Sequence, residues 1–171
     1  MDVSGVEVSL DQVLNNKELR LKRQQEWLNR HFSPLVSFSI NMPGAVKHND
    51  AAVHIFTQGI QHIIQHCLKN DWQIVAEQSF NGITGPEAIF AISCSALELK
   101  LAMVAIEEQH RFGRLMDLDV IDVDGTSLSR QDHLIPRRKC LLCDEDAVVC
   151  ARSRRHDLSL LLQKINEITN D

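Results

Sequence analysis

The chain has 171 residues, 44% of them hydrophobic, which suffices for one sizeable core, so we expect residues 1–171 to form a single domain. Its net charge of −5 excludes a general nucleic-acid-binding protein, because such proteins need a basic surface. No apolar run approaches the roughly 20 residues that span a bilayer, and the first residues lack a signal-peptide pattern, so we expect a cytoplasmic protein without a membrane partner.

The first part of the chain predicts a helix, a strand and a second helix. A capping box at Ser9 begins an amphipathic helix to about residue 31, with an apolar stripe formed by Leu10, Leu14, Leu21 and Leu28. Residues 35–41 alternate apolar and small polar side chains, which is typical of a half-buried strand. Apolar residues recur every three or four positions over 50–70, which predicts a helix packed on a sheet.

Two further strands and a helix follow. The strands at 72–80 and 87–93 are separated by a segment rich in glycine and proline. Ser95 caps a helix that runs to about residue 110 and is predicted to bury Leu97, Leu101, Val104 and Ala105. Gly113 ends this part, and a strand is predicted at 115–123.

The order β-α-β-β-α-β predicts an α+β fold of the ferredoxin-like type, an antiparallel sheet with both helices on one face. Residues 32–123 form this predicted core, with the N-terminal helix in front of it. Residues 124–171 form a Cys- and Arg-rich segment that ends in a helix.

Asp117 and Asp119 lie two positions apart on the last predicted strand, so they share one face while their apolar neighbours fill the other. Two such carboxylates, about 7 Å apart along the backbone, can converge on Mg²⁺ and favour phosphoryl chemistry. Arg114, just upstream, is placed to clamp a leaving phosphate. The alternative is a pair of solvent-facing strand residues, but aspartate is disfavoured in strands, which favours a functional role.

Three cysteines and a histidine are clustered near the C-terminus. Cys140, Cys143, Cys150 and His156 follow the pattern C-x2-C-x6-C-x5-H, and four such ligands suit a closed tetrahedral zinc site. The alternative is three reduced cysteines in a short loop, since the middle spacing is not that of a common zinc finger.

The same segment carries the one dense basic patch of the sequence, formed by Arg137, Arg138, Lys139, Arg152, Arg154 and Arg155. Such a patch suits phosphates or an acidic protein partner, although a solvated basic face is the commoner explanation. No acidic run nearby is predicted to be long enough to neutralise it.

The loop at residues 41–47, NMPGAVK, leaves the first strand and leads to a helix. Its backbone N–H groups, together with Asn41 and Lys47, are candidates to hold a phosphate. As a pattern alone this signal is weak, because Pro-Gly usually marks only a turn.

With these motifs the chain resembles the apo-citrate lyase phosphoribosyl-dephospho-CoA transferases, also called holo-citrate lyase synthases. The resemblance rests on NMPGAVK, GRLMDLDVID at 113–122, Ser129-Arg130, Pro136-Arg137-Arg138 and CLLCDEDAVVCARSRRH at 140–156. These motifs occur in the family's order at family-like intervals, and they span nearly the whole chain.

The resemblance implies transfer of 2′-(5″-phosphoribosyl)-3′-dephospho-CoA from its triphosphate donor, triphosphoribosyl-dephospho-CoA, to a serine of the citrate lyase acyl carrier (gamma) subunit, with release of diphosphate. The aspartate pair also resembles the metal-binding Asp-x-Asp of nucleotidyltransferases. We expect Mg²⁺ at Asp117 and Asp119, assisted by Arg114, and phosphate binding by Asn41, Lys47, Arg137, Arg138, Arg152, Arg154 and Arg155. The serine proton would pass to His110 or to a carboxylate that the fold brings near.

A second hypothesis, from a different functional class, makes the chain a non-catalytic adaptor. Its zinc knuckle and basic patch would then dock an acidic carrier protein or an RNA end. This hypothesis predicts stable binding without turnover. RNA is the weaker candidate, because the basic patch has no interleaved aromatic side chain on which bases could stack.

Overall fold

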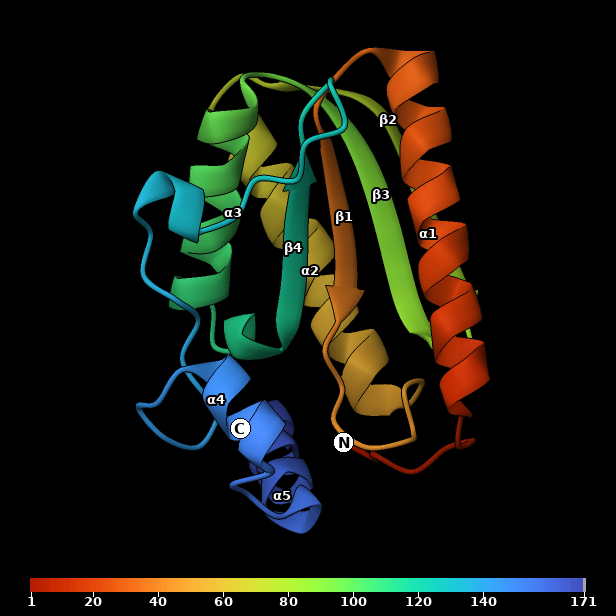
Figure 1. Cartoon of the computed structure of the whole chain (residues 1–171), viewed down its shortest axis with the longest axis vertical. Coiled ribbons are helices and arrows are strands. Elements are labelled where there is room, and N and C mark those ends of the chain that lie inside the picture. The colour runs from red at the N-terminus through yellow and green to blue at the C-terminus, as the bar shows by residue number, and fades with distance from the viewer. Residues whose placement is uncertain (171) are drawn as a thin grey trace.

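The computed structural model describes residues 1–170 and shows a four-stranded sheet between helices (Figure 1). The strands lie in the order β2-β3-β1-β4, and every neighbouring pair is antiparallel. Their bounds are β1 Leu35–Ile40, β2 Gln73–Gly82, β3 Gly85–Ser93 and β4 Met116–Ile121. The helices are α1 Leu10–His31, α2 Asp50–Lys69, α3 Ala96–Gln109, α4 Ala147–Ser153 and α5 Leu158–Asn170, with 3₁₀ turns at Gly113–Leu115 and Gln131–His133. Every predicted strand and helix is present, whereas α4 was not predicted.

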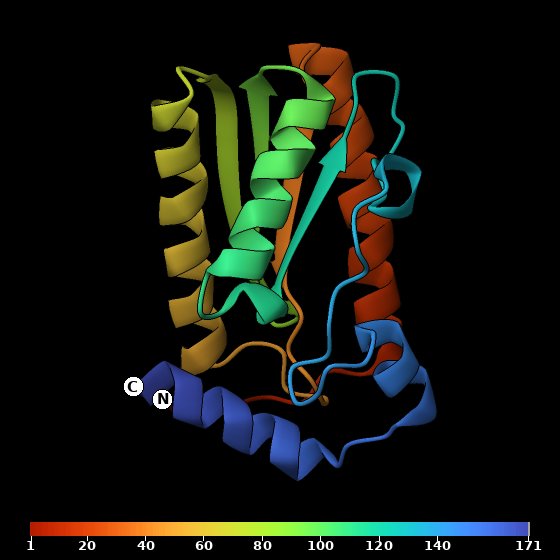
Figure 2. The ribbon, with the colours of Figure 1, turned by 90° about the vertical axis from the view of Figure 1, so that its left-hand side faces the viewer.

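Both faces of the sheet are covered. Figure 2 shows α2 and α3 on one face and α1 on the other. The larger core lies under α2 and α3, where Phe38, Ile55 and Met103 are fully buried. A smaller cluster under α1 includes Leu28 and Ile89. The face under α1 is therefore apolar only in part, which leaves room for polar groups.

Helix α1 packs on the sheet mainly through polar side chains. The predicted apolar stripe is wrong over most of its length, because the first three of its leucines are exposed: Leu10, Leu14 and Leu21. Asn16, Arg20 and Arg23 instead donate hydrogen bonds to Glu87, a buried residue of β3. A buried carboxylate needs such partners, and satisfying it turned the polar side of α1 inward.

Helix α3 also differs from its prediction. Leu97 and Leu101 are about half exposed, so their predicted burial is wrong, and the buried apolar side consists of Leu99, Met103, Val104 and Ile106. Lys100 and Glu107 are buried on the same helix. These two charges interrupt the apolar stripe because they reach the edge of β4 and the cavity beside it.

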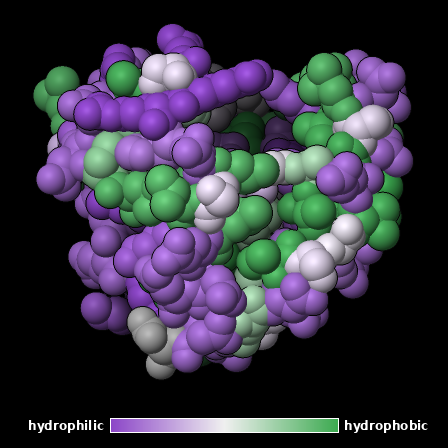
Figure 3. Space-filling view, turned by 90° about the horizontal axis from the view of Figure 1, so that it is seen from below, coloured by the Kyte–Doolittle hydropathy of each residue, from purple (hydrophilic) through white to green (hydrophobic). Residues whose placement is uncertain are grey.

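The C-terminal helix α5 lies across the end of the molecule next to α2, and its Ile165 is fully buried in the main core (Figure 2). Figure 3 views this end and shows hydrophobic side chains among hydrophilic ones, with a hollow beside them. α5 itself leaves Leu158 and Leu160 about half exposed. Among residues 1–170, no helix combines the length and the apolar character that crossing a membrane requires.

Candidate active site and metal centre

Asp117 and Asp119 lie on β4, an edge strand of the sheet. Their apolar neighbours on the strand belong to the core under α2 and α3, so the two carboxylates face the α1 side, and the predicted alternation is confirmed. Opposite them on β1 lie two small residues, Ser39 beside Asp117 and Ser37 beside Asp119. The sheet surface around the two carboxylates is therefore not filled by bulky side chains.

An open cavity of about 500 Å³ adjoins this face, and Asp119 forms part of its lining. Its walls come from α3, from residues 127–131 and from the start of α4. Four cationic side chains line it: Lys100, Arg130, Arg137 and Arg138. The lining also includes two carboxylates, Glu107 and Asp119, so the cations outnumber them by two and the cavity is suited to polyanionic ligands.

Glu107 holds the C-terminal segment against β4. It is 3% exposed, and its carboxylate accepts hydrogen bonds from Arg130 at 2.5 Å and from Arg138 at 2.6 Å. It also accepts one from the backbone N–H of Leu118 at 3.0 Å, on the free edge of β4. One buried carboxylate thus joins α3, the edge strand and the arginine segment.

The two aspartates differ in their partners. Asp117 forms an ion pair with Arg138 at 3.1 Å, whereas no cationic side chain among residues 1–170 lies within ion-pair distance of Asp119. Desolvation by the cavity walls and the neighbouring charge of Asp117 raise the pKa of Asp119 to about 6, against the opposing effect of Lys100. The Asp119 side chain is nevertheless open to the cavity. A divalent cation between these carboxylates would relieve the repulsion, so the pair fits the predicted Mg²⁺ site.

Two smaller recesses adjoin the cavity at Asn41, which lines all three. One, of about 270 Å³, extends toward the cysteine cluster, and the other, of about 210 Å³, lies against α1 and includes Asp117. Lys47 lines both, burial lowers its pKa, and its ammonium donates to the Met42 carbonyl at 2.5 Å. An ammonium has three donors, so two remain for a ligand.

Arg114 and Asp119 line different cavities. Arg114 lines the recess next to the cysteine cluster, and its guanidinium donates to the Lys139 carbonyl at 3.3 Å. Arg138 lines both this recess and the main cavity. The structure therefore places Arg138, rather than Arg114, at the junction of the aspartate pair and the basic segment.

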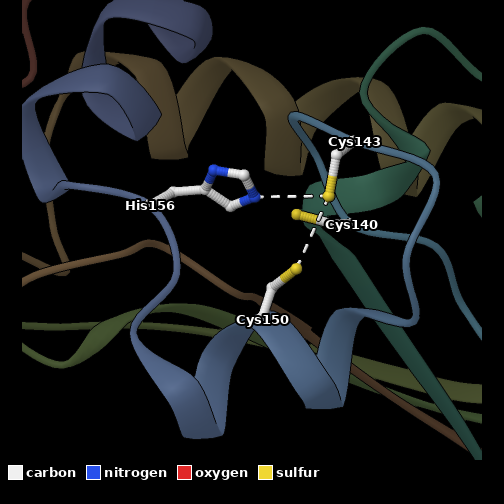
Figure 4. A group of neighbouring side chains, drawn as sticks. All are labelled: Cys140, Cys143, Cys150 and His156. Atoms are coloured by element: carbon white, nitrogen blue, oxygen red, sulfur yellow. Dashed lines mark hydrogen bonds between the residues drawn. The ribbon is translucent and has the colours of Figure 1, made fainter.

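Cys140, Cys143, Cys150 and His156 are brought together, as Figure 4 shows. All four ligand atoms lie within 4.8 Å of one another. The Cys143 sulfur is 3.5 Å from that of Cys150 and 3.3 Å from Nε2 of His156. Zinc–sulfur bonds of about 2.3 Å in a tetrahedron place sulfur atoms about 3.8 Å apart, so the cluster has the size of a zinc site.

The basic patch is divided by the structure. Arg137 and Arg138 line the main cavity, but Arg152, Arg154 and Arg155 line none of the three recesses. The expectation that no acidic run neutralises the patch is wrong in part, because Asp146 pairs with Arg137 at 3.8 Å and with Lys139 at 3.1 Å, and Glu145 pairs with Arg155 at 3.8 Å. The turn at 144–146 folds these carboxylates back onto the patch.

His110 lies outside the three recesses. Its ring packs against those of His62 and Phe112, with centroids 4.4 Å and 5.3 Å away. Burial, with His62 and Arg111 nearby, lowers its pKa to about 4. The carboxylates at the cavity are therefore better placed than His110 to accept a proton there.

Sequence reasoning missed the roles of Lys100, Glu107 and Arg130 in this site. The available signal was a pair of charged residues inside the otherwise apolar inner face of α3, two helical turns apart.

Comparison with known proteins gives one consistent result. The family model described as apo-citrate lyase phosphoribosyl-dephospho-CoA transferase matches residues 8–171. A protein of Vibrio cholerae serotype O1 (strain M66-2), named probable apo-citrate lyase phosphoribosyl-dephospho-CoA transferase, is 56% identical over 165 residues, which cover 96% of this chain and 93% of that protein. The apo-citrate lyase phosphoribosyl-dephospho-CoA transferase of Escherichia coli O1:K1 / APEC is 39% identical over 164 residues, which cover 96% and 90%. The chain therefore belongs to the apo-citrate lyase phosphoribosyl-dephospho-CoA transferase family.

Proposed function

We propose that this protein attaches the phosphoribosyl-dephospho-CoA prosthetic group to apo-citrate lyase. The donor is triphosphoribosyl-dephospho-CoA, and the acceptor is a serine of the acyl carrier (gamma) subunit. Family membership supports the reaction class. The observation that carries the proposal is the aspartate pair beside a cavity with four cationic side chains. An adaptor without catalytic activity is not favoured, because the relatives are named as transferases.

The bond changes follow from the substrates. The serine oxygen attacks the phosphorus next to the ribose, the bond from that phosphorus to the diphosphate breaks, and the serine proton passes to a carboxylate at the cavity. Asp117 and Asp119 would hold Mg²⁺, which supplies charge neutralisation for the triphosphate. Among the described residues, Arg138 donates hydrogen bonds to Glu107 and Asp117 through Nη2 alone. The other N–H groups of its guanidinium can therefore bind phosphate oxygens.

The remaining cations extend phosphate binding on both sides of the aspartates. Arg137 lines the main cavity, Asn41 connects the three recesses, and Lys47 has free donors toward the recess at α1. A long polyanionic donor that binds along these recesses would have its triphosphate held beside Asp119. Arg152, Arg154 and Arg155 face solvent outside the recesses and are proposed to contact the acidic surface of the acceptor protein.

The experiment that tests the proposed function is modification of apo-citrate lyase. Purified protein, donor and Mg²⁺ are mixed with apo-citrate lyase, and the release of diphosphate is followed. We expect diphosphate to appear only when apo-citrate lyase and this protein are both present. No release of diphosphate with folded wild-type protein would refute the proposal.

We also propose that the cysteine cluster, formed by Cys140, Cys143, Cys150 and His156, holds a structural zinc ion. Its ligand set and its size support this proposal. Protein purified without added zinc is expected to contain about one zinc per chain, and Cys143→Ser to lose it and melt roughly 5–10 °C lower. Cys94→Ala, a cysteine outside the cluster, is the control and should keep the metal. Absence of zinc from the wild-type protein by elemental analysis would contradict this assignment.

The strand order and the two helices on one face support a ferredoxin-like core, which we propose for residues 32–123. Burial of Ile165 in the main core supports one domain for the whole chain, the C-terminal segment 124–171 included. All five cysteines are free, which supports a reducing compartment such as the cytoplasm.

A further inference from the structure

Lys100 is a buried cation without a partner. It lies on α3, is 5% exposed, and lines the cavity that also contains Asp119. No side chain or backbone group among residues 1–170 forms a hydrogen bond or an ion pair with its ammonium. Lysine is almost never so deeply buried without a pairing partner, and the ammonium, which is not itself a fully buried atom, meets solvent in the cavity.

Glu107, a second buried charged residue of α3, does have partners, so the lack of a partner is particular to Lys100. Glu107 lies two helical turns further along, on the same side of α3, and is buried to a similar extent. It has three partners: Arg130, Arg138 and the Leu118 amide. The fold thus satisfies one of the two buried charges and leaves the other facing the cavity.

The other cations of the cavity are already engaged. Arg130 pairs with Glu107 and Glu108, Arg138 pairs with Glu107 and Asp117, and Arg137 lies 3.8 Å from Asp146. Lys100 is the cavity cation for which the described residues supply no carboxylate at ion-pair distance. An anion that enters the cavity would therefore find the ammonium of Lys100 available.

We propose that Lys100 binds the phosphate groups of the donor that leave as diphosphate. The inference rests on the proposed function and adds to it the residue that receives the leaving group. An ammonium is a compact charge with three donors, which suits phosphate oxygens. Its place beside Asp119 lets one polyphosphate contact both Lys100 and a cation held by the aspartates.

The competing explanation is that Lys100 serves only as a distant counter-ion of Asp119. The two explanations predict different melting temperatures for a variant in which the charge of Lys100 is removed. Replacing a buried charge that has no partner by an apolar side chain of similar shape leaves the melting temperature unchanged or raises it. Removing a needed counter-ion lowers it, because the carboxylate is left uncompensated.

The test measures calorimetric binding of inorganic diphosphate in the presence of Mg²⁺. Lys100→Met is expected to weaken binding at least about tenfold and to melt no lower than the wild type, while Lys100→Arg stays within about threefold. Lys22→Met, an exposed lysine of α1, is the matched control and should bind as the wild type does. Undiminished binding by Lys100→Met would overturn the inference, and so would a lower melting temperature in that variant without diphosphate.

Diphosphate binding and prosthetic-group transfer, both measured on the wild type and on Lys100→Met, distinguish a failure of this inference from a failure of the proposed function. If the wild type transfers the prosthetic group but Lys100→Met binds diphosphate normally, the inference is wrong and the function stands. If the wild type binds diphosphate through Lys100 but transfers nothing, the anion site stands and the function is wrong.

Discussion

Replacing Asp119 by Asn is expected to lower the rate of prosthetic-group transfer by about 10³-fold, and Asp117→Asn by a similar factor. Asparagine keeps the shape of the side chain but removes the charge that would hold Mg²⁺, and several kcal/mol of transition-state stabilisation correspond to such a factor. The measurement is the initial rate of transfer at saturating donor and several Mg²⁺ concentrations.

The control for both variants is Asp122→Asn. Asp122 follows β4 directly and accepts a hydrogen bond from the Val123 amide, and it lines none of the three recesses. We expect its rate to stay within about threefold of the wild type. Wild-type rates in both Asp117→Asn and Asp119→Asn would show that the pair does not bind a catalytic metal.

Replacing Glu107 by Gln is expected to destabilise the protein by about 2–3 kcal/mol and to lower its melting temperature by roughly 5–10 °C. The substitution leaves an acceptor for the Leu118 amide but removes the charge that Arg130 and Arg138 share. The partly exposed arginines keep some hydration, which places the loss below that of a fully buried pair. Thermal unfolding followed by circular dichroism measures the change.

Glu108→Gln is the matched control. Glu108 follows Glu107 in α3 and pairs with the same Arg130 at 2.9 Å, but its side chain is 47% exposed. We expect a loss of no more than about 0.5 kcal/mol. Equal melting temperatures for Glu107→Gln and Glu108→Gln would mean that Glu107 does not fasten the arginine segment to β4. Slower transfer is expected only in Glu107→Gln, since Arg138 then loses one of its two anchors.

Periodicity and caps predicted the elements because both are local. Ser9 and Ser95 cap α1 and α3 as expected, and the alternation on β4 correctly separated the two aspartates from the apolar core. The inner sides of α1 and α3 were predicted wrongly for one reason. Apolar stripes identify a buried side only when no buried charge requires partners, and Glu87 and Glu107 both do.

The site was predictable where spacing along the chain brings ligands together. Cys140 and Cys143 with Cys150 and His156 formed the predicted cluster, and it is compact. The contact from Arg138 to Asp117 joins residues far apart in sequence, across the edge of the sheet. No local pattern encodes such a contact, and none places the Arg114 guanidinium in the recess next to the cysteine cluster.

The most direct test of the proposed function is the intact mass of the acyl carrier subunit after incubation with this protein, triphosphoribosyl-dephospho-CoA and Mg²⁺. We expect a gain equal to one phosphoribosyl-dephospho-CoA group on a single serine, with one diphosphate released per group attached. With Asp119→Asn we expect no gain within the time in which the wild type completes the reaction. An unchanged carrier mass with folded wild-type protein would contradict the proposed function.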